Sequence, residues 1–218
     1  MKFTYSIPTK ILFGPGSFND LATTPLPGKK ALVVITAGKS MRANGYLDRL
    51  IDMLDKQGIG HALFDKILPN PVLRHVHEGA ALAREQGCDF VIGLGGGSSI
   101  DSAKSIAVMA KNPGDYWDYI SGGSGKGQPL VNGALPIVAI ATTAGTGTEA
   151  DPFPVITNGE EKIGGGGAKS DVVCQIAADV FGLPVVRSQT HEACSIGSSM
   201  VAFVAKGVFA DFDAAAKA

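Results

Sequence analysis

Three consecutive glycines and a serine, Gly95-Gly96-Gly97-Ser98, stand between an apolar segment and a segment with helical spacing. Glycines let the backbone approach a pyrophosphate closely, and a helix N-terminus offers free N–H groups and a favourable dipole. Ser98 adds a hydroxyl donor, and Asp101 and Lys104 follow on the same segment. The run lacks the strict G-x-G-x-x-G spacing. A tight turn without a ligand stays open as the alternative, but three glycines exceed what such a turn needs, so we predict phosphate binding.

Two further polar turns follow apolar segments in the same way. Ala37-Gly38-Lys39 follows residues 31–36, and the turn from Thr142 to Gly147 follows residues 136–141. Both segments, like residues 90–94, are continuous apolar runs that are typical of strands buried on both faces. Ligands of parallel sheets bind beyond the carboxyl ends of the strands. We expect all three turns to lie at that edge.

Segments with helical spacing alternate with these strands. The predicted helices run from Ser40, as a cap, to Gly58, from Pro71, as the first residue, to Gly87, and over residues 98–111. Alternating strands and helices indicate a mainly parallel sheet with right-handed crossovers. The predicted fold class is α/β: a Rossmann-like, doubly wound sheet over residues 1–164.

The character of the sequence changes after about residue 160. Four glycines, Gly164–Gly167, precede a predicted helix that Ser170 caps and Gly182 ends; a strand over 183–186 and a helix over 192–206 follow. A segment with a single short strand does not easily hold its own core. We therefore expect the α-β-α tail, residues 165–218, to dock on the 1–164 domain or on a second copy in a homodimer.

Composition narrows the classes of function. The 218 residues are 45% hydrophobic with a net charge of −1, and no basic stripe favours nucleic acid or an anionic membrane as a partner. No apolar run approaches the roughly 18 residues that cross a membrane, and the first residues do not resemble a signal peptide. The three cysteines, Cys88, Cys174 and Cys194, are expected to be free thiols. We predict a cytoplasmic protein.

Two long segments resemble a known enzyme family. LGGGSSIDSAKSIAVMAKNPGDYWDYI, residues 94–120, is similar to the GGGS-x-x-D-x-x-K segment of iron-containing alcohol dehydrogenases. PIVAIATTAGTGTEAD, residues 136–151, resembles their second cofactor motif, and FGPGS at 13–17 and PNP at 69–71 also match. The resemblance is closest to the butanol dehydrogenase branch and covers about residues 3–164. It implies NAD or NADP as the cofactor.

The resemblance also implies which residues bind that cofactor. They are Gly38, Lys39 and Ser40 near the adenine ribose, Gly95, Gly96, Gly97 and Ser98 at the pyrophosphate, and Asp101, Thr142, Thr143 and Thr146 on the nicotinamide side. Ordinary strand-end turn chemistry is the alternative for the threonines. No carboxylate follows residues 31–36 to accept a hydrogen bond from a ribose 2′-OH and repel a 2′-phosphate. We therefore expect NADPH to be tolerated.

The family further implies a helical domain in which one Asp and three His hold a catalytic divalent metal. Such sites need several converging nitrogen and oxygen ligands. The chain has four histidines, His61, His75, His77 and His191, and none stands in that metal motif. His75 and His77 are two apart on a predicted helix and do not share a face. We expect no catalytic metal and interpret each histidine as a surface or packing residue.

From Gly165 onward the sequence resembles the C-terminal end of FGGY-family carbohydrate kinases, particularly the xylulokinases. The matching turn contacts the adenosine of ATP in that family, which implies weak ATP binding by Gly165, Gly166, Gly167 and Ala168. A glycine linker followed by a helical tail is the alternative. The Asp-x-Gly-Thr phosphate loop and the sugar-binding domain of a kinase are missing, and phosphoryl transfer needs them. The chain is interpreted as a chimera joined near Gly164.

Three hypotheses follow. The chain could be an NAD(P)-binding domain without efficient catalysis, an NAD(P)-dependent alcohol or aldehyde oxidoreductase completed by another chain, or a structural chimera without physiological activity. The missing metal ligands weigh against the second, because the cofactor supplies the hydride but the site must activate the carbonyl. The first and third are compatible, and no catalytic residue is assigned.

Overall fold

The computed structural model describes residues 9–159 and 161–163. The predictions for the tail, including its docking, its elements and the ATP contacts of Gly165, Gly166, Gly167 and Ala168, lie outside the described residues, as do Cys174, Cys194 and His191.

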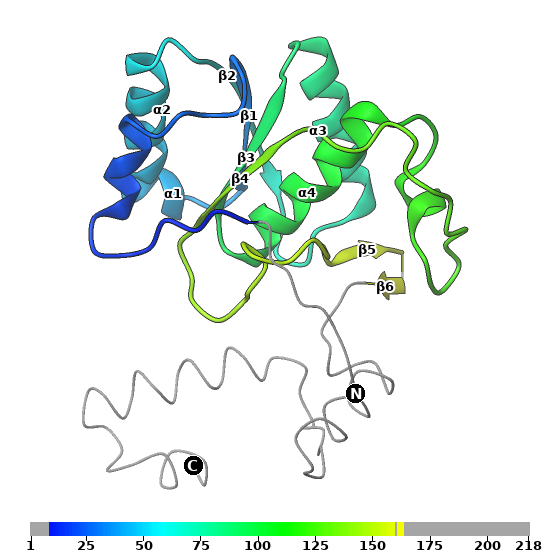
Figure 1. Ribbon diagram of the computed structural model, residues 1–218. Helices are drawn as coiled ribbons and strands as arrows, with labels where there is room; N and C mark the ends of the chain where they lie inside the picture. Colours follow the sequence, from blue (N-terminus) through cyan, green and yellow to red (C-terminus); the bar gives the residue numbers. More distant parts are fainter. Residues whose placement is uncertain (1–8, 160, 164–218) are drawn as a thin grey trace, which may run out of the picture. The chain divides into compact units, whose positions relative to one another are not determined.

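A parallel sheet forms the centre of the described part. Its strands are β1 (Lys30–Thr36), β2 (Gly60–Ile67), β3 (Phe90–Gly95) and β4 (Ile137–Ala141), in the order β2-β1-β3-β4 (Figure 1). All neighbouring strands in it are parallel. A separate antiparallel pair joins β5 (Ile156–Asn158) to β6 (Glu161–Ile163). The predicted parallel sheet is confirmed.

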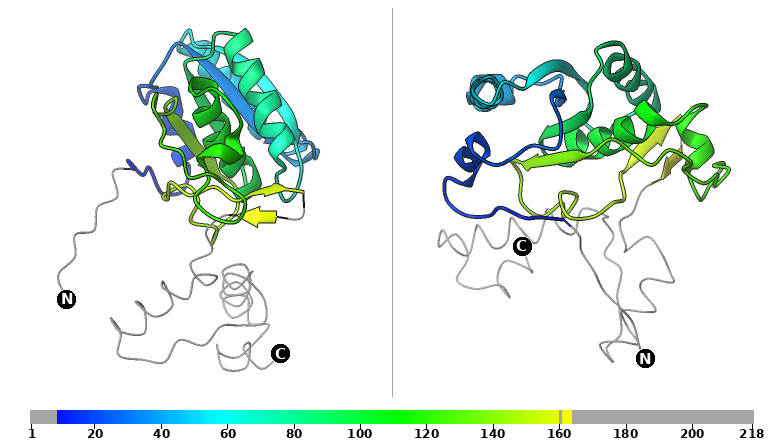
Figure 2. Two further views of the ribbon diagram at one scale, coloured as in Figure 1. Left: turned by 90° about the vertical axis from the view of Figure 1, so that its right-hand side faces the viewer. Right: turned by 45° about the horizontal axis from the view of Figure 1, so that its top comes forward.

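Helices cover both faces of this sheet (Figure 2). They are η1 (Ser17–Ala22), α1 (Ser40–Ala43) and α2 (Tyr46–Lys56) on one face, and α3 (Leu73–Glu85) and α4 (Gly97–Lys111) on the other, with η2 (Tyr116–Tyr119) after α4. Alternate residues of β1 enter two different cores, because successive side chains of a strand point to opposite faces. Val33 packs with the α2 cluster, and Val34 packs with the α3 and α4 cluster. The sheet is therefore doubly wound.

The structure corrects two predicted helix starts. The first predicted helix is divided at Gly45, whose φ of 69° lies in the left-handed region and separates α1 from α2. Ser40 is the first residue of α1 and not its cap; Lys39 holds the cap position without a side-chain bond. Helix α3 begins at Leu73, so Pro71 precedes the helix instead of opening it. Gly58 and Gly87 follow α2 and α3 with φ of 68° and 64°, as expected for helix stops.

Two strands also differ from expectation. β2 was not predicted, because His61, Asp65 and Lys66 interrupt its apolar pattern. It is an edge strand, and one of its sides tolerates polar residues. The strand predicted at 136–141 exists as β4, but it is not buried on both faces: it ends the sheet, and Ile137 is 39% exposed.

The glycine-rich segment after η2 is tied to that helix. The Trp117 indole Nε1–H donates to Ser124 Oγ at 2.8 Å, and the Gly127 N–H donates to the Ile120 carbonyl at 2.9 Å. Trp117 itself is buried. None of the helices in the described part of the chain is long and apolar enough to cross a bilayer.

Candidate functional site

The three predicted turns lie at the same edge of the sheet. β1, β3 and β4 run parallel, so the turns that follow them leave from their shared carboxyl edge. The last residue of β3, Gly95, pairs in register with Ala141 of β4. The Thr142 N–H then donates to the Gly95 carbonyl at 2.9 Å. The turn after β4 therefore starts beside the glycine turn.

Gly95 and Gly96 lack a side chain for two different steric reasons. Gly95 has a φ of 141°, and a Cβ there would lie 2.6 Å from Ser99 Oγ. Gly96 has ordinary extended backbone, but a Cβ on it would lie 3.0 Å from Thr143 Oγ1. A side chain at Gly96 would thus fill the space between the start of α4 and Thr143.

Helix α4 begins at Gly97 without a side-chain cap. The first N–H groups of a helix have no partner within it, and the helix dipole favours an anion there. Ser98 and Thr142 are half-buried at this edge, and Thr143 is exposed. Thr146 follows in the same turn and is exposed. The structure therefore brings Gly95–Ser98, Thr142 and Thr143 together at one edge of the sheet, and their roles at a cofactor stay predictions.

Asp101 and Lys104 are buried, each 7% exposed, one turn into α4. The Asp101 carboxylate accepts hydrogen bonds from the Thr148 hydroxyl and from the Val155 N–H. Lys104 Nζ lies 2.6 Å from Thr148 Oγ1 and 3.3 Å from Asp151 Oδ1. Burial raises the pKa of Asp101 above its ordinary value, although its hydrogen bonds and Lys104 act in the opposite direction.

The adenine-side residues Gly38, Lys39 and Ser40 are exposed after β1. An ion pair lies near them: the guanidinium of Arg42, on α1, bonds to the carboxylate of Asp65, on β2. Asp65 was missed because β2 was missed. No carboxylate stands in the turn directly after β1, but Asp65 on the neighbouring strand β2 supplies one near the same edge.

The described histidines do not gather into a metal site. His75 is buried against the Phe64 ring, and desolvation, followed by the charge of Arg74, lowers its pKa. His61 lies 3.8 Å from Asp55, and His77 lies 3.2 Å from Asp115. Within residues 9–159 and 161–163, no three His, Cys, Asp or Glu side chains converge. The donor set of this part does not fit a catalytic divalent metal, so we derive no step through one.

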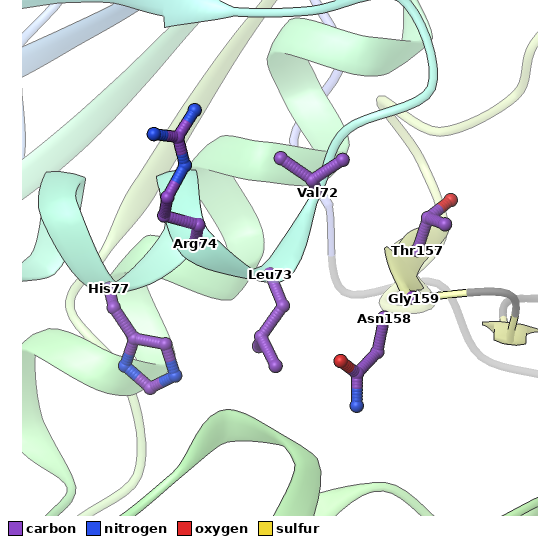
Figure 3. Close-up of a pocket in the computed structure, with 7 residues that line it drawn as sticks. All are labelled: Val72, Leu73, Arg74, His77, Thr157, Asn158 and Gly159. Carbon is purple, nitrogen blue, oxygen red and sulfur yellow. The ribbon is translucent and has the colours of Figure 1, made fainter.

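Two open grooves lie away from the predicted cofactor turn. One, of about 420 Å³, is lined by the start of α3 and by β5, including Arg74, His77 and Asn158 (Figure 3). The other, of about 440 Å³, lies along the end of α4. Neither is lined by a residue of the glycine turn or by Thr142 or Thr143.

Comparison with known proteins decides the family. The model of the family "Iron-containing alcohol dehydrogenase" matches residues 8–178. This chain belongs to the iron-containing alcohol dehydrogenase family. A probable NADH-dependent butanol dehydrogenase 1 of Bacillus subtilis is 39% identical over 73% of this chain and 40% of its own length. The resemblance predicted from the sequence motifs is confirmed.

Solved structures of the iron-containing alcohol dehydrogenase family have the same fold. An NADH-dependent butanol dehydrogenase A of Thermotoga maritima aligns with a TM-score of 0.66 and 35% identity, covering 79% of this chain and 42% of that one. A sulfoacetaldehyde reductase of Bifidobacterium kashiwanohense, solved with NAD+, aligns with a TM-score of 0.63 and 31% identity, covering 75% and 43%. This chain therefore spans roughly two fifths of its relatives, and the predicted α/β, Rossmann-like fold is confirmed.

A second family model matches the end of the chain. The C-terminal domain of the FGGY family of carbohydrate kinases matches residues 162–206. The predicted resemblance to the FGGY family is thus confirmed, and its finer assignment to the xylulokinases stays a prediction. The two matches overlap over residues 162–178, so the boundary at Gly164 stays a prediction.

Proposed function

We propose that residues 1–164 bind a nicotinamide dinucleotide at the carboxyl edge of the sheet, with its pyrophosphate at the start of α4. The observation that supports this most directly is the absence of a side chain at Gly96, which lies beside Thr143 and directly before α4, a helix whose start has no side-chain cap. Oriented N–H groups without a competing side chain are suited to a diphosphate. Relatives of this chain are named NADH-dependent enzymes, which agrees with the assignment.

We further propose that this chain binds the cofactor without efficient turnover by itself. A bound nicotinamide supplies a hydride, but a carbonyl also needs a group that polarises it. The described residues offer no convergent metal ligands for that task. The alternative is an alcohol or aldehyde oxidoreductase that another chain completes. The names of the relatives favour it, and a turnover assay distinguishes it from a chain that only binds the cofactor.

The choice of cofactor is part of the proposal. Lys39 and Arg42 place two cations after β1, and the carboxylate of Asp65 is already paired with Arg42. A paired carboxylate repels a 2′-phosphate less than a free one. We propose that NADPH binds at least as well as NADH.

For the end of the chain we propose a fusion origin with weak ATP binding at Gly165–Ala168. The kinase-family match supports it. A structural chimera without physiological activity stays compatible with this origin and with cofactor binding.

The test is a titration of the full chain with NADH, NADPH and ATP, followed by the fluorescence of the reduced nicotinamide and, for ATP, by calorimetry. Gly96→Val places a side chain where the phosphate would approach, and we expect it to abolish binding of both dinucleotides. Gly60→Val, on extended backbone with only ordinary contacts, is the matched control. Equal binding by Gly96→Val and the parent would show that the site is elsewhere.

Turnover is measured in parallel with butanal and NADPH, with and without added Fe²⁺ or Zn²⁺. We expect binding without turnover. Steady NADPH oxidation by the purified chain would overturn the proposed lack of catalysis and leave the binding site standing.

A further inference from the structure

A closed set of polar contacts fastens α4 to the segment that returns from the sheet edge. Its members are Asp101, Lys104 and Thr148, which we call the α4 clasp. The Thr148 hydroxyl donates to the Asp101 carboxylate and accepts from Lys104 Nζ at 2.6 Å. Because the hydroxyl has a single proton, it can donate to the carboxylate and accept from the ammonium group, and it thereby bonds to both charged groups.

Two more contacts extend the α4 clasp along the same segment. Asp151 Oδ1 accepts from Lys104 Nζ at 3.3 Å and from the Phe153 N–H at 2.7 Å. Asp101 also accepts from the Val155 N–H. Because Asp101 and Lys104 are each 7% exposed, these charges depend on their partners for compensation.

All three members of the α4 clasp follow the proposed pyrophosphate turn along the chain: Asp101 and Lys104 lie on α4, and Thr148 lies after β4. The turn after β4 is attached at its beginning, where the Thr142 N–H donates to the Gly95 carbonyl, and again at Thr148. Between these attachments stands Thr143, whose hydroxyl borders the space at Gly96. A chain held at both ends has fewer conformations to lose when a ligand binds.

We propose that Asp101, Lys104 and Thr148 are positioning residues for the dinucleotide: they hold the segment after β4 against α4 so that Thr143 stays at the glycine turn. Asp101 then acts through Thr148 and not by touching the nicotinamide. This rests on the proposed cofactor site and gives a role to Lys104 and Thr148, which lie in the two motifs but had no assigned role at the cofactor.

The decisive variants are Thr148→Val, which keeps the shape and removes the hydroxyl, and Thr148→Ser, which keeps the hydroxyl. We expect Thr148→Val to raise the Kd for both NADH and NADPH about tenfold, the loss that one hydrogen bond to a charged group allows. We expect Thr148→Ser to bind within about twofold of the parent.

A control separates positioning from stability. Ser105→Ala removes another buried hydroxyl from α4, one that contacts the Asp101 carbonyl and the Tyr116 hydroxyl at 3.0 Å each and does not reach the segment after β4. Thermal unfolding is measured for all variants. We expect Ser105→Ala to lose stability but keep the parental Kd. If Thr148→Val also keeps the parental Kd, the clasp is structural only and the proposal fails.

A second measurement needs no cofactor. Glu149 follows Thr148, so cleavage after it by a glutamate-specific protease reports opening of this segment. We expect about tenfold faster cleavage in Thr148→Val than in the parent or Ser105→Ala. If the parent binds no dinucleotide, the proposed function fails while the cleavage rates still test the clasp; equal rates would overturn the clasp itself.

Discussion

Gly93 of β3 lies directly against Ala103 of α4, and a Cβ on Gly93 would be 3.0 Å from the Ala103 Cβ and 3.0 Å from the Ile100 Cα. The second of these atoms belongs to the helix backbone and cannot rotate away. The absence of a side chain at Gly93 therefore sets how closely α4 approaches the sheet. Since α4 begins in the glycine turn, Gly95–Ser98, the close packing of α4 on β3 also fixes the position of that turn relative to the sheet.

Gly93→Ala should therefore destabilise the fold. We expect a loss of about 1–3 kcal/mol, the usual range for added volume in a packed interior, measured by urea unfolding. Gly60→Ala is the control, because its Cβ would meet the Lys30 Cγ at an ordinary 3.4 Å. Equal stability of the two variants would mean that α4 can shift outward without cost.

Substitution of Gly95 should mainly lower stability, and substitution of Gly96 should mainly weaken cofactor binding. Gly95→Ala forces a side chain onto a φ of 141° and into Ser99, and we expect it to cost about 1–3 kcal/mol of unfolding free energy. Gly96→Ala lies on extended backbone beside a movable threonine side chain. We expect it to keep most of the stability and to weaken NADPH binding. Loss of stability in both variants, with NADPH affinity unchanged, would favour the alternative of a turn without a ligand.

Asp89 should make stability depend on pH. Its carboxylate accepts hydrogen bonds from the N–H groups of Lys29 and Lys30, at 2.8 to 3.0 Å, just where β1 begins. The small loss of hydration at this exposed position acts to raise its pKa, but the backbone hydrogen bonds outweigh it and hold the pKa below the ordinary value of 3.8. A lowered folded-state pKa gives stability that is present above pH 3.8 and lost as the pH falls through the folded value.

Asp89→Asn should consequently lose about 1 kcal/mol at pH 7, at the lower end for bonds to a charged group because the carboxylate is exposed. The gap between parent and variant should close as the pH falls below about 4. Urea unfolding at several pH values measures it. Asp52→Asn, at an exposed position of α2, is the control; a gap for Asp89→Asn that persists unchanged at pH 3 would contradict the assignment.

Arg42 should influence the choice between the two dinucleotides. Its guanidinium is oriented by the Asp65 carboxylate at the adenine side of the proposed site. We expect Arg42→Gln to weaken NADPH about tenfold and NADH less than twofold, because only NADPH offers a 2′-phosphate to a cation. Titrations at low and high salt check this, since the parental preference should shrink with salt. An equal effect on both cofactors would show that Arg42 does not contact the 2′-phosphate of NADPH.

The central strands and α4 were predictable because their sequences leave little choice. Residues 31–35 and 90–94 are apolar and form most of the two inner strands, where both faces are buried. β2 was not predictable on the same rule, because an edge strand tolerates His61, Asp65 and Lys66. The Arg42–Asp65 ion pair was not predictable either, because it forms only when α1 and β2 are neighbours in the fold.

The glycine turn and its neighbouring threonines were predictable from local pattern and resemblance. The α4 clasp was not, because Asp101 and Thr148 are 47 residues apart in two separate motifs, and neither motif alone shows that their side chains are hydrogen-bonded. A buried lysine also contradicts the usual surface preference of that residue type. Only the fold shows that Lys104 donates hydrogen bonds to two oxygen atoms, Thr148 Oγ1 and Asp151 Oδ1.

Trp117 gives the molecule a built-in optical reporter. It is the one tryptophan of the chain, it is 7% exposed, and its indole N–H is held by Ser124. Its emission should be blue-shifted in the native state and move to the red when the region after α4 loosens. Comparing the midpoint of that shift with the loss of far-ultraviolet circular dichroism would show whether this region melts together with the sheet or before it.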